Sequence, residues 1–169
     1  MAELEAEIAR LVREYQAKTG KSLTIGAVES ATGGRIADRI TNVPGSSDYF
    51  KGSVVAYSNE VKTALLGVKK VTIESYGAVS EQTALEMARG GRKLLNVDIC
   101  VSDTGIAGPA GSTPSKPVGL FFLGLATRDE SLSQKHVFQG NREGNKRDAA
   151  EGAFNMLKQY LLRRVKVTG

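Results

Sequence analysis

The spacing of apolar residues along the chain predicts helices that alternate with strands. In three stretches apolar side chains recur every three or four residues, as in a helix that buries one face. These stretches contain Leu4, Ile8, Leu11, Val12 and Tyr15; Ala84, Met87, Ala88, Gly91, Leu94 and Leu95; and Ala150, Ala153, Phe154, Leu157, Tyr160 and Leu161. We expect Gly20 to end the first helix and Ser80 to cap the second.

Shorter runs that are rich in apolar and β-branched residues indicate strands. These runs lie at 22–28, 53–57, 97–102, 118–126 and 132–138. The last two runs are separated only by a short polar connection around Asp129, so they must pair antiparallel. The other three alternate with helices, which is typical of parallel strands.

Two short helices complete the pattern. One follows the first strand and contains Ile36 and Ile40, and the other is capped by Ser58 or Asn59 and stops near Gly67. We therefore expect a layered α/β/α fold with a mixed, mostly parallel sheet. Residues 1–169 form a single domain in this interpretation, because the chain contains no repeat, low-complexity tract or linker.

Composition narrows the function classes. Apolar residues make up 41% of the chain, no apolar run reaches membrane-spanning length, and the acidic N-terminus does not resemble a secretory signal. We expect a cytoplasmic protein. The net charge of +5 is largely interspersed and tryptophan is absent, so nucleic acid is not the expected main partner. An anionic small molecule explains the charge equally well.

The residue counts also limit the chemistry. Cys100 is the only cysteine and His136 the only histidine, which excludes an intrachain disulfide and a Cys/His metal cluster. Cys100 is expected in the core of its strand. His136 is expected on the surface of an edge strand, so a Ser-His-Asp triad is not favoured.

Hydroxyl groups, a lysine and glycines follow the three parallel strands. The segments are 29–34, 57–62 and 103–109. Ligands of open α/β sheets bind beyond the carboxyl ends of parallel strands, so these segments are expected to converge on one site. Ser30 would lie beside helix N-terminal N–H groups, which can stabilise an oxyanion. Alternatively, Ser30 and Thr32 only cap the helix, and the residues alone favour this simpler interpretation.

A serine nucleophile needs a base, and Lys62 is the candidate. Its place near a helix N-terminus and its burial would favour the neutral amine, whereas the neighbouring Glu60 would favour the ammonium. A solvated surface lysine is the alternative. Thr104 could relay a proton to the reacting group or form a hydrogen bond with it. Asp103 is a candidate too, but neighbouring strand residues face opposite sides, so we do not expect both to enter the site. The loop 105–119 is expected to form either a lid or a pocket wall.

Taken together, several segments resemble the C-terminal domain family of the competence/damage-inducible protein CinA. They are 29–34, 43–47, 55–59 with Lys62, 76–80, 104–109 and 116–119. The resemblance covers nearly the whole chain and implies a three-layer α/β/α fold whose five-stranded sheet has one antiparallel strand. It also implies the stand-alone form of the domain. Two departures are Ala31, where the family commonly has cysteine, and Asn141, where it often has aspartate.

The enzymatic members of this family hydrolyse nicotinamide mononucleotide (NMN) to nicotinate mononucleotide and ammonia. By motif position, Ser30 would be the nucleophile, Lys62 its base and Thr104 an assisting hydroxyl. The substrate-binding residues would be Thr32, Gly33, Gly34, Ser46, Tyr57, Gly105, Gly108 and Arg142.

In this scheme N–H groups near Thr32, Gly33 and Gly34, or that of Gly105, would hold the oxyanion. Arg142 and the loop 45–47 would hold the phosphate. No metal or cofactor is expected, and the protein is expected to form a homo-oligomer. Two alternatives stay open, a non-catalytic nucleotide-binding module and a nucleic-acid-associated protein.

Overall fold

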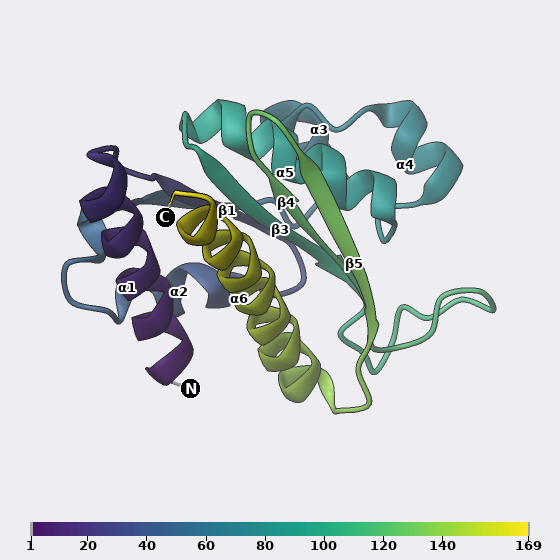
Figure 1. Cartoon of the computed structure of the whole chain (residues 1–169). Helices are drawn as coiled ribbons and strands as arrows, with labels where there is room; N and C mark the ends of the chain where they lie inside the picture. Colours follow the sequence, from purple (N-terminus) through teal and green to yellow (C-terminus); the bar gives the residue numbers. More distant parts are fainter. Residues whose placement is uncertain (1, 169) are drawn as a thin grey trace.

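A computed structural model describes residues 2–168 and shows a five-stranded sheet between two layers of helices (Figure 1). The elements in chain order are α1 (Ala2–Thr19), β1 (Ile25–Glu29), α2 (Arg35–Thr41), the short 3₁₀ helix η1 (Ser46–Asp48), β2 (Phe50–Val55), α3 (Asn59–Leu66), α4 (Lys70–Tyr76), α5 (Glu81–Leu95), β3 (Ile99–Gly105), β4 (Leu120–Ala126), β5 (Ser131–Val137) and α6 (Arg142–Val167).

The strand order is β2-β1-β3-β4-β5. β1 pairs parallel with both β2 and β3, whereas β4 pairs antiparallel with β3 and β5. β4 is therefore the one strand that runs against the others, and the expected mixed, mostly parallel α/β/α fold is confirmed. The strand positions match the sequence prediction to within a few residues.

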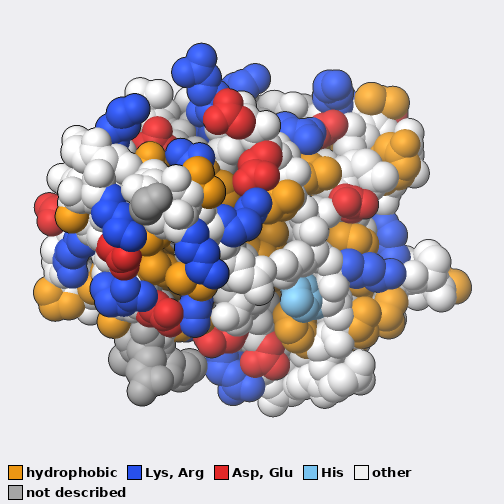
Figure 2. Space-filling view, viewed as in Figure 1, with side chains coloured by type: hydrophobic (Ala, Val, Ile, Leu, Met, Phe, Trp, Pro, Cys, Tyr) orange, Lys and Arg blue, Asp and Glu red, His pale blue; other side chains and the backbone are white. Residues whose placement is uncertain are grey.

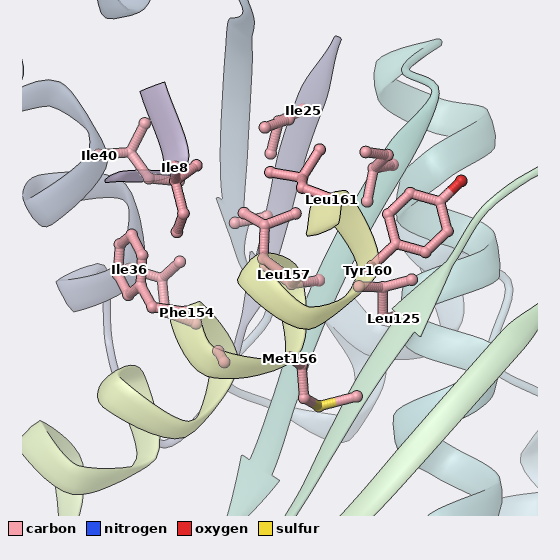
Figure 3. Close-up of a cluster of buried hydrophobic side chains, with 14 of the residues drawn as sticks. Ile8, Ile25, Ile36, Ile40, Leu125, Phe154, Met156, Leu157, Tyr160 and Leu161 are labelled. Carbon is pink, nitrogen blue, oxygen red and sulfur yellow. The ribbon is translucent and has the colours of Figure 1, made fainter. Parts of the chain in front are cut away.

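The larger hydrophobic core lies between the sheet and α1, α2 and α6. Figure 3 shows Phe154, Leu157 and Leu161 of α6 pointing toward Ile36 of α2 and Ile25 of β1. These side chains are almost completely buried. Each contributes about 1.5–3 kcal/mol through removal of apolar surface from water, which is why the helical spacing was a reliable signal.

The second core lies on the other face, where α5 packs on the sheet and α3 packs against α5. Gly91 allows α5 to approach closely, because an added Cβ would lie 2.4 Å from Val28 and 2.8 Å from Cys100. Cys100 is completely buried there, as expected. The caps predicted from the sequence are also confirmed, since Ser58 caps α3, Ser80 caps α5, and Gly20 follows α1 with a positive φ.

The surface carries charges of both signs close together. Figure 2 shows basic and acidic side chains intermixed over the face formed by α1 and α6. Lys158 of α6 lies 2.8 Å from Glu7 of α1, and Arg10 lies 2.8 Å from Glu14 within α1. Among residues 2–168, no helix is both long and apolar enough to cross a membrane.

Candidate active site

A cavity of about 240 Å³ lies at the carboxyl ends of β1, β2 and β3. The segments that follow the three strands all contribute to its lining, together with the turn before α5 and the start of α6. The polar lining side chains include Ser30, Tyr57, Lys62, Thr104 and Arg142. The parallel arrangement therefore brings together the residues that the sequence placed after separate strands.

The contact between Ser30 and Lys62 is the central feature of the cavity. The Nζ atom of Lys62 lies 2.9 Å from the Oγ atom of Ser30. Lys62 also lies 2.9 Å from the carbonyl oxygen of Ala56 and 3.0 Å from that of Tyr57. Its side chain comes from α3 and is only 2% exposed. The interpretation of Lys62 as a solvated surface residue is therefore wrong.

Burial lowers the pKa of Lys62 from the ordinary value of 10.5, while the nearby Asp103 carboxylate opposes this shift. The charged group that opposes it is thus Asp103 of β3 and not the sequence neighbour Glu60. Glu60 is exposed to solvent, because it lies on the outer face of α3. A buried lysine becomes a neutral amine more readily than a surface lysine, because burial disfavours the charged form.

Thr104 and Asp103 lie on opposite faces of β3. The Thr104 hydroxyl lines the cavity and donates a hydrogen bond of 2.6 Å to the carbonyl of Ala78, just before α5. Asp103 lies beneath the cavity floor and is completely buried. Its oxygens accept hydrogen bonds from the N–H groups of Ser30 and Thr32, at 3.1 and 3.0 Å. Asp103 thus holds the backbone of the turn that carries Ser30.

The start of α2 is capped by a carboxylate from the end of β1. Glu29 is completely buried, and its oxygens accept three N–H groups of the helix start. The donors are Gly34, Ile36 and Ala37. Neither Ser30 nor Thr32 caps the helix, because Ser30 contacts Lys62 and the Thr32 hydroxyl donates to Glu29 at 2.7 Å. The simple capping interpretation of these two hydroxyls is therefore wrong.

These hydrogen bonds also change the expected oxyanion donors. The N–H groups of Thr32, Gly33 and Gly34 already donate to Asp103, to the Ser30 carbonyl and to Glu29. The N–H of Ala31 has no hydrogen-bond partner among residues 2–168, and Ala31 lines the cavity. Ala31 is therefore the better placed donor in this turn.

The mouth of the cavity is formed by Tyr57 and Arg142, with Gly105 and Gly108 in the wall. The guanidinium of Arg142 donates to the Gly108 carbonyl at 2.8 Å and to the Tyr57 hydroxyl at 3.2 Å. Arg142 is the first residue of α6, whose N-cap is Asn141. The Asn141 side chain accepts from the Gly144 N–H at 2.9 Å, so its amide oxygen caps α6.

Other predicted site residues lie outside this cavity. Thr32 is completely buried behind it. Gly33 and Gly34 line a neighbouring hollow of about 900 Å³ between α1, α2 and α6. Ser46 lies in η1, next to Tyr49, whose carbonyl accepts the N–H of the first residue of β1. Ser46 is therefore at the amino ends of the strands, and its predicted contact with the substrate phosphate does not fit this arrangement.

The single histidine is distant from this chemistry. His136 lies on the edge strand β5 and stacks on Phe138, with ring centroids 5.2 Å apart. It is half-buried and does not line the cavity. In the part of the chain that the structure describes, no group of three or more His, Cys, Asp or Glu side chains is arranged to hold a metal ion.

Comparisons with known proteins agree with this architecture. The CinA C-terminal domain family matches residues 4–161. CinA-like proteins of Sulfurihydrogenibium and Thermotoga neapolitana are 42% and 44% identical over 160 and 161 residues. Each alignment covers 95% of this chain but only 38% of the relative, so the chain spans less than two fifths of their length.

Solved structures show the same fold over almost the whole chain. The competence/damage inducible protein CihA from Agrobacterium tumefaciens superposes with a TM-score of 0.85 at 34% identity, covering 94% of each chain. A CinA superfamily protein from Klebsiella pneumoniae superposes with a TM-score of 0.88 at 27% identity, covering 96% of this chain and 98% of that one. The chain therefore belongs to the CinA C-terminal domain family.

Proposed function

We propose that this domain is an amidohydrolase that converts NMN and water to nicotinate mononucleotide and ammonia. The observation that supports it most strongly is the buried Lys62 amine, 2.9 Å from the Ser30 hydroxyl in a cavity at the sheet edge. Serine-lysine pairs of this kind activate a hydroxyl for attack on an amide carbonyl. The choice of NMN as substrate rests on the resemblance to the amidases of the family.

In its neutral form, the Lys62 amine has two N–H bonds and one lone pair for its three contacts. The two N–H bonds of the amine can be donated to the carbonyls of Ala56 and Tyr57. In the neutral form this leaves the nitrogen lone pair to accept the Ser30 O–H across the 2.9 Å that separates Nζ from Oγ. In the first step, the Ser30 oxygen attacks the carboxamide carbon while its proton moves to Lys62. The negative charge that develops on the carboxamide oxygen is held by the Ala31 N–H.

In the second step, the Lys62 ammonium gives its proton to the nitrogen of the carboxamide. The carbon–nitrogen bond breaks, ammonia leaves, and the acyl group stays on Ser30 as an ester. The Thr104 hydroxyl donates to the Ala78 carbonyl, so its oxygen is available to accept an N–H from the carboxamide and orient it. A water molecule, activated by Lys62, then hydrolyses the ester.

The phosphate of NMN is assigned to Arg142 at the cavity mouth. Its guanidinium is fixed by the Gly108 carbonyl and the Tyr57 hydroxyl, and its remaining N–H groups can bind a phosphate oxygen. Binding there would place the nicotinamide ring deeper in the cavity, toward Ser30.

The simplest experiment is to incubate the purified protein with NMN and to measure ammonia and nicotinate mononucleotide. We expect both products in equal amounts. Binding of NMN without turnover would instead support a nucleotide-binding module. Strong, salt-dependent binding to DNA with no NMN hydrolysis would support the nucleic-acid alternative.

Metal removal gives a second expected result. Because Ser30 and Lys62 supply the nucleophile and the base, hydrolysis of NMN should proceed at an unchanged rate after treatment with excess chelator. The measurement is ammonia release before and after dialysis against the chelator. Loss of activity that zinc restores would contradict the serine-lysine mechanism.

Cys100 gives a third expected result. The thiol is completely buried in β3, and burial raises its pKa to about 12, so it stays protonated and unreactive near neutral pH. We expect thiol-blocking reagents and Cys100→Ala to leave the rate of NMN hydrolysis unchanged in folded protein. A folded Cys100→Ala protein without activity would show that this thiol takes part in the reaction.

A further inference from the structure

The reaction outlined above does not use Asp103, although this carboxylate lies directly beneath the reacting pair. It is completely buried on β3, and buried carboxylates are costly unless they have a specific partner. Both of its oxygens are engaged. One accepts the N–H of Ser30, the other accepts the N–H of Thr32, and the first also contacts the Thr32 hydroxyl. Asp103 thus accepts backbone hydrogen bonds from the residues on both sides of Ala31.

The Thr32 hydroxyl connects Asp103 to a second buried carboxylate. It lies between Asp103 and Glu29, within hydrogen-bond distance of both, yet it carries only one proton. Glu29 accepts four further hydrogen bonds. The other donors are Gly34, Ile36, Ala37 and Ser53. The Thr32 hydroxyl can therefore donate to only one of the two carboxylates at a time.

The charges that face Asp103 come from two elements. Glu29 on β1 contributes a negative charge, and Lys62 on α3 can carry a positive one. On β4 its neighbour is the apolar Leu123. The two helices that pack on β3 bury only uncharged residues. On α5 these are Thr83, Ala84, Met87, Ala88 and Gly91, and on the first half of α6 they are Gly144, Asn145, Ala149, Ala150, Gly152, Ala153 and Phe154.

We propose that Asp103 is a positioning residue, whose carboxylate holds the Ser30 turn and whose charge moves the pH range in which Lys62 accepts the serine proton to higher pH. This inference rests on the proposed function, since it concerns the same serine and lysine. It assigns a role to a residue that contacts neither the cavity nor the substrate. Asp103 would act only through the Ser30 backbone and through the charge of Lys62.

The direction of the effect follows from the charges. An ionised Asp103 favours the ammonium form of Lys62 and so opposes the neutral base. Burial raises the pKa of Asp103 to about 6, with the Thr32 hydrogen bond opposing the rise and Glu29 adding to it. Removing the negative charge should therefore let Lys62 lose its proton at a lower pH.

The first test is Asp103→Asn, which keeps the shape of the side chain and removes its charge. We expect the acid limb of the pH profile of kcat/KM for NMN to move about one pH unit lower. The NMR titration of Lys62, followed in ¹³C-labelled lysine, should move in the same direction. The matched control is Asp98→Asn. Asp98 accepts hydrogen bonds from the Thr24 N–H and hydroxyl at the amino ends of β1 and β3, away from the cavity. In Asp98→Asn, the midpoints of the acid limb and of the Lys62 titration should therefore stay unchanged.

A second measurement does not depend on whether Asp103→Asn folds. Coupling between two charges is reciprocal, so removing the lysine must change the titration of the aspartate. In ligand-free Lys62→Met, the ¹³C carboxyl signal of Asp103 should titrate at a pH about one unit higher than in the wild-type protein.

An unmoved acid limb in folded Asp103→Asn, or an unmoved Asp103 titration in folded Lys62→Met, would overturn the proposal. Failure of the wild-type protein to hydrolyse NMN would refute the proposed function instead. In that case the two NMR titrations, which need no substrate, would still decide whether Asp103 controls Lys62.

Discussion

Replacement of Ser30 by alanine should lower the turnover of NMN by at least about a thousandfold. In the proposed mechanism the Ser30 oxygen forms the bond to the substrate, and no other hydroxyl lies next to the Lys62 amine within the described residues. NMN should bind to Ser30→Ala with nearly the wild-type Kd, because the substitution leaves the proposed phosphate site at Arg142 unchanged. Ammonia release gives the turnover, and calorimetry gives the Kd.

Ser102→Ala is the matched control for Ser30→Ala. Ser102 is also a buried serine, but its hydroxyl donates to the Ala84 carbonyl beneath α5 and does not line the cavity. Loss of this hydrogen bond in Ser102→Ala should lower the free energy of unfolding by about 1 kcal/mol and leave turnover unchanged. Near-wild-type turnover by folded Ser30→Ala would show that the nucleophile is another group, such as Thr104 or water.

Lys62→Met should cause a loss of turnover as large as that of Ser30→Ala. Methionine fills most of the space of the lysine side chain but cannot accept a proton, and an unactivated serine barely attacks an amide. Lys62→Arg should not restore activity, since a guanidinium stays protonated near neutral pH. The control is Lys70→Met, which changes an exposed lysine on the neighbouring α4. Substantial turnover by folded Lys62→Met would exclude Lys62 as the base.

The expected pH dependence of NMN hydrolysis by the wild-type protein follows from Lys62 as well. Because burial lowers the pKa of Lys62, kcat/KM should rise with pH along a limb whose midpoint lies below 10.5. The contribution of Lys62 to the free energy of unfolding changes with pH in the same direction. Between the folded and unfolded pKa values the unfolded chain binds more protons, so the contribution of Lys62 to the free energy of unfolding rises with pH in this window. Lys62→Met should remove both effects.

The fold could be predicted largely because each major element has a local signal. The helices α1, α5 and α6 show apolar spacing, and Ser58 and Ser80 cap their own helices. The sequence does not predict the helix α4, because no side chain caps its start. The Lys69 N–H and the Thr72 hydroxyl both donate to Glu86 of α5, at 2.8 and 2.7 Å. Contacts that come from another helix leave no signal in the neighbouring residues.

The start of α2 was misinterpreted for a related reason. The side chain that caps α2 belongs to Glu29, which lies five residues before the N-cap residue Gly34. Local capping rules consider residues within about three positions. Local rules therefore favour Ser30 and Thr32 as the caps of α2, whereas Glu29 caps it in the structure. The contribution of Asp103 could not be predicted at all, since it depends on the pairing of β1 with β3.

The position of Ser46 could have been predicted from topology. β1 and β2 are parallel neighbours, so the chain must return to the amino ends of the strands before β2 begins. A loop directly before β2 then lies opposite the carboxyl edge that holds the cavity. By contrast, Ser30, Lys62 and Thr104 all follow or end strands, and the rule for open α/β sheets brought them together correctly.

The most direct test of the serine-lysine amidase is the rate of ammonia release from NMN by four folded proteins, namely the wild type, Ser30→Ala, Lys62→Met and the double variant. We expect steady release by the wild type and one common low rate for the three variants, because residues that act as a unit lose their effect together. No release by the wild type, or a variant with a near-wild-type rate, would contradict the proposed mechanism.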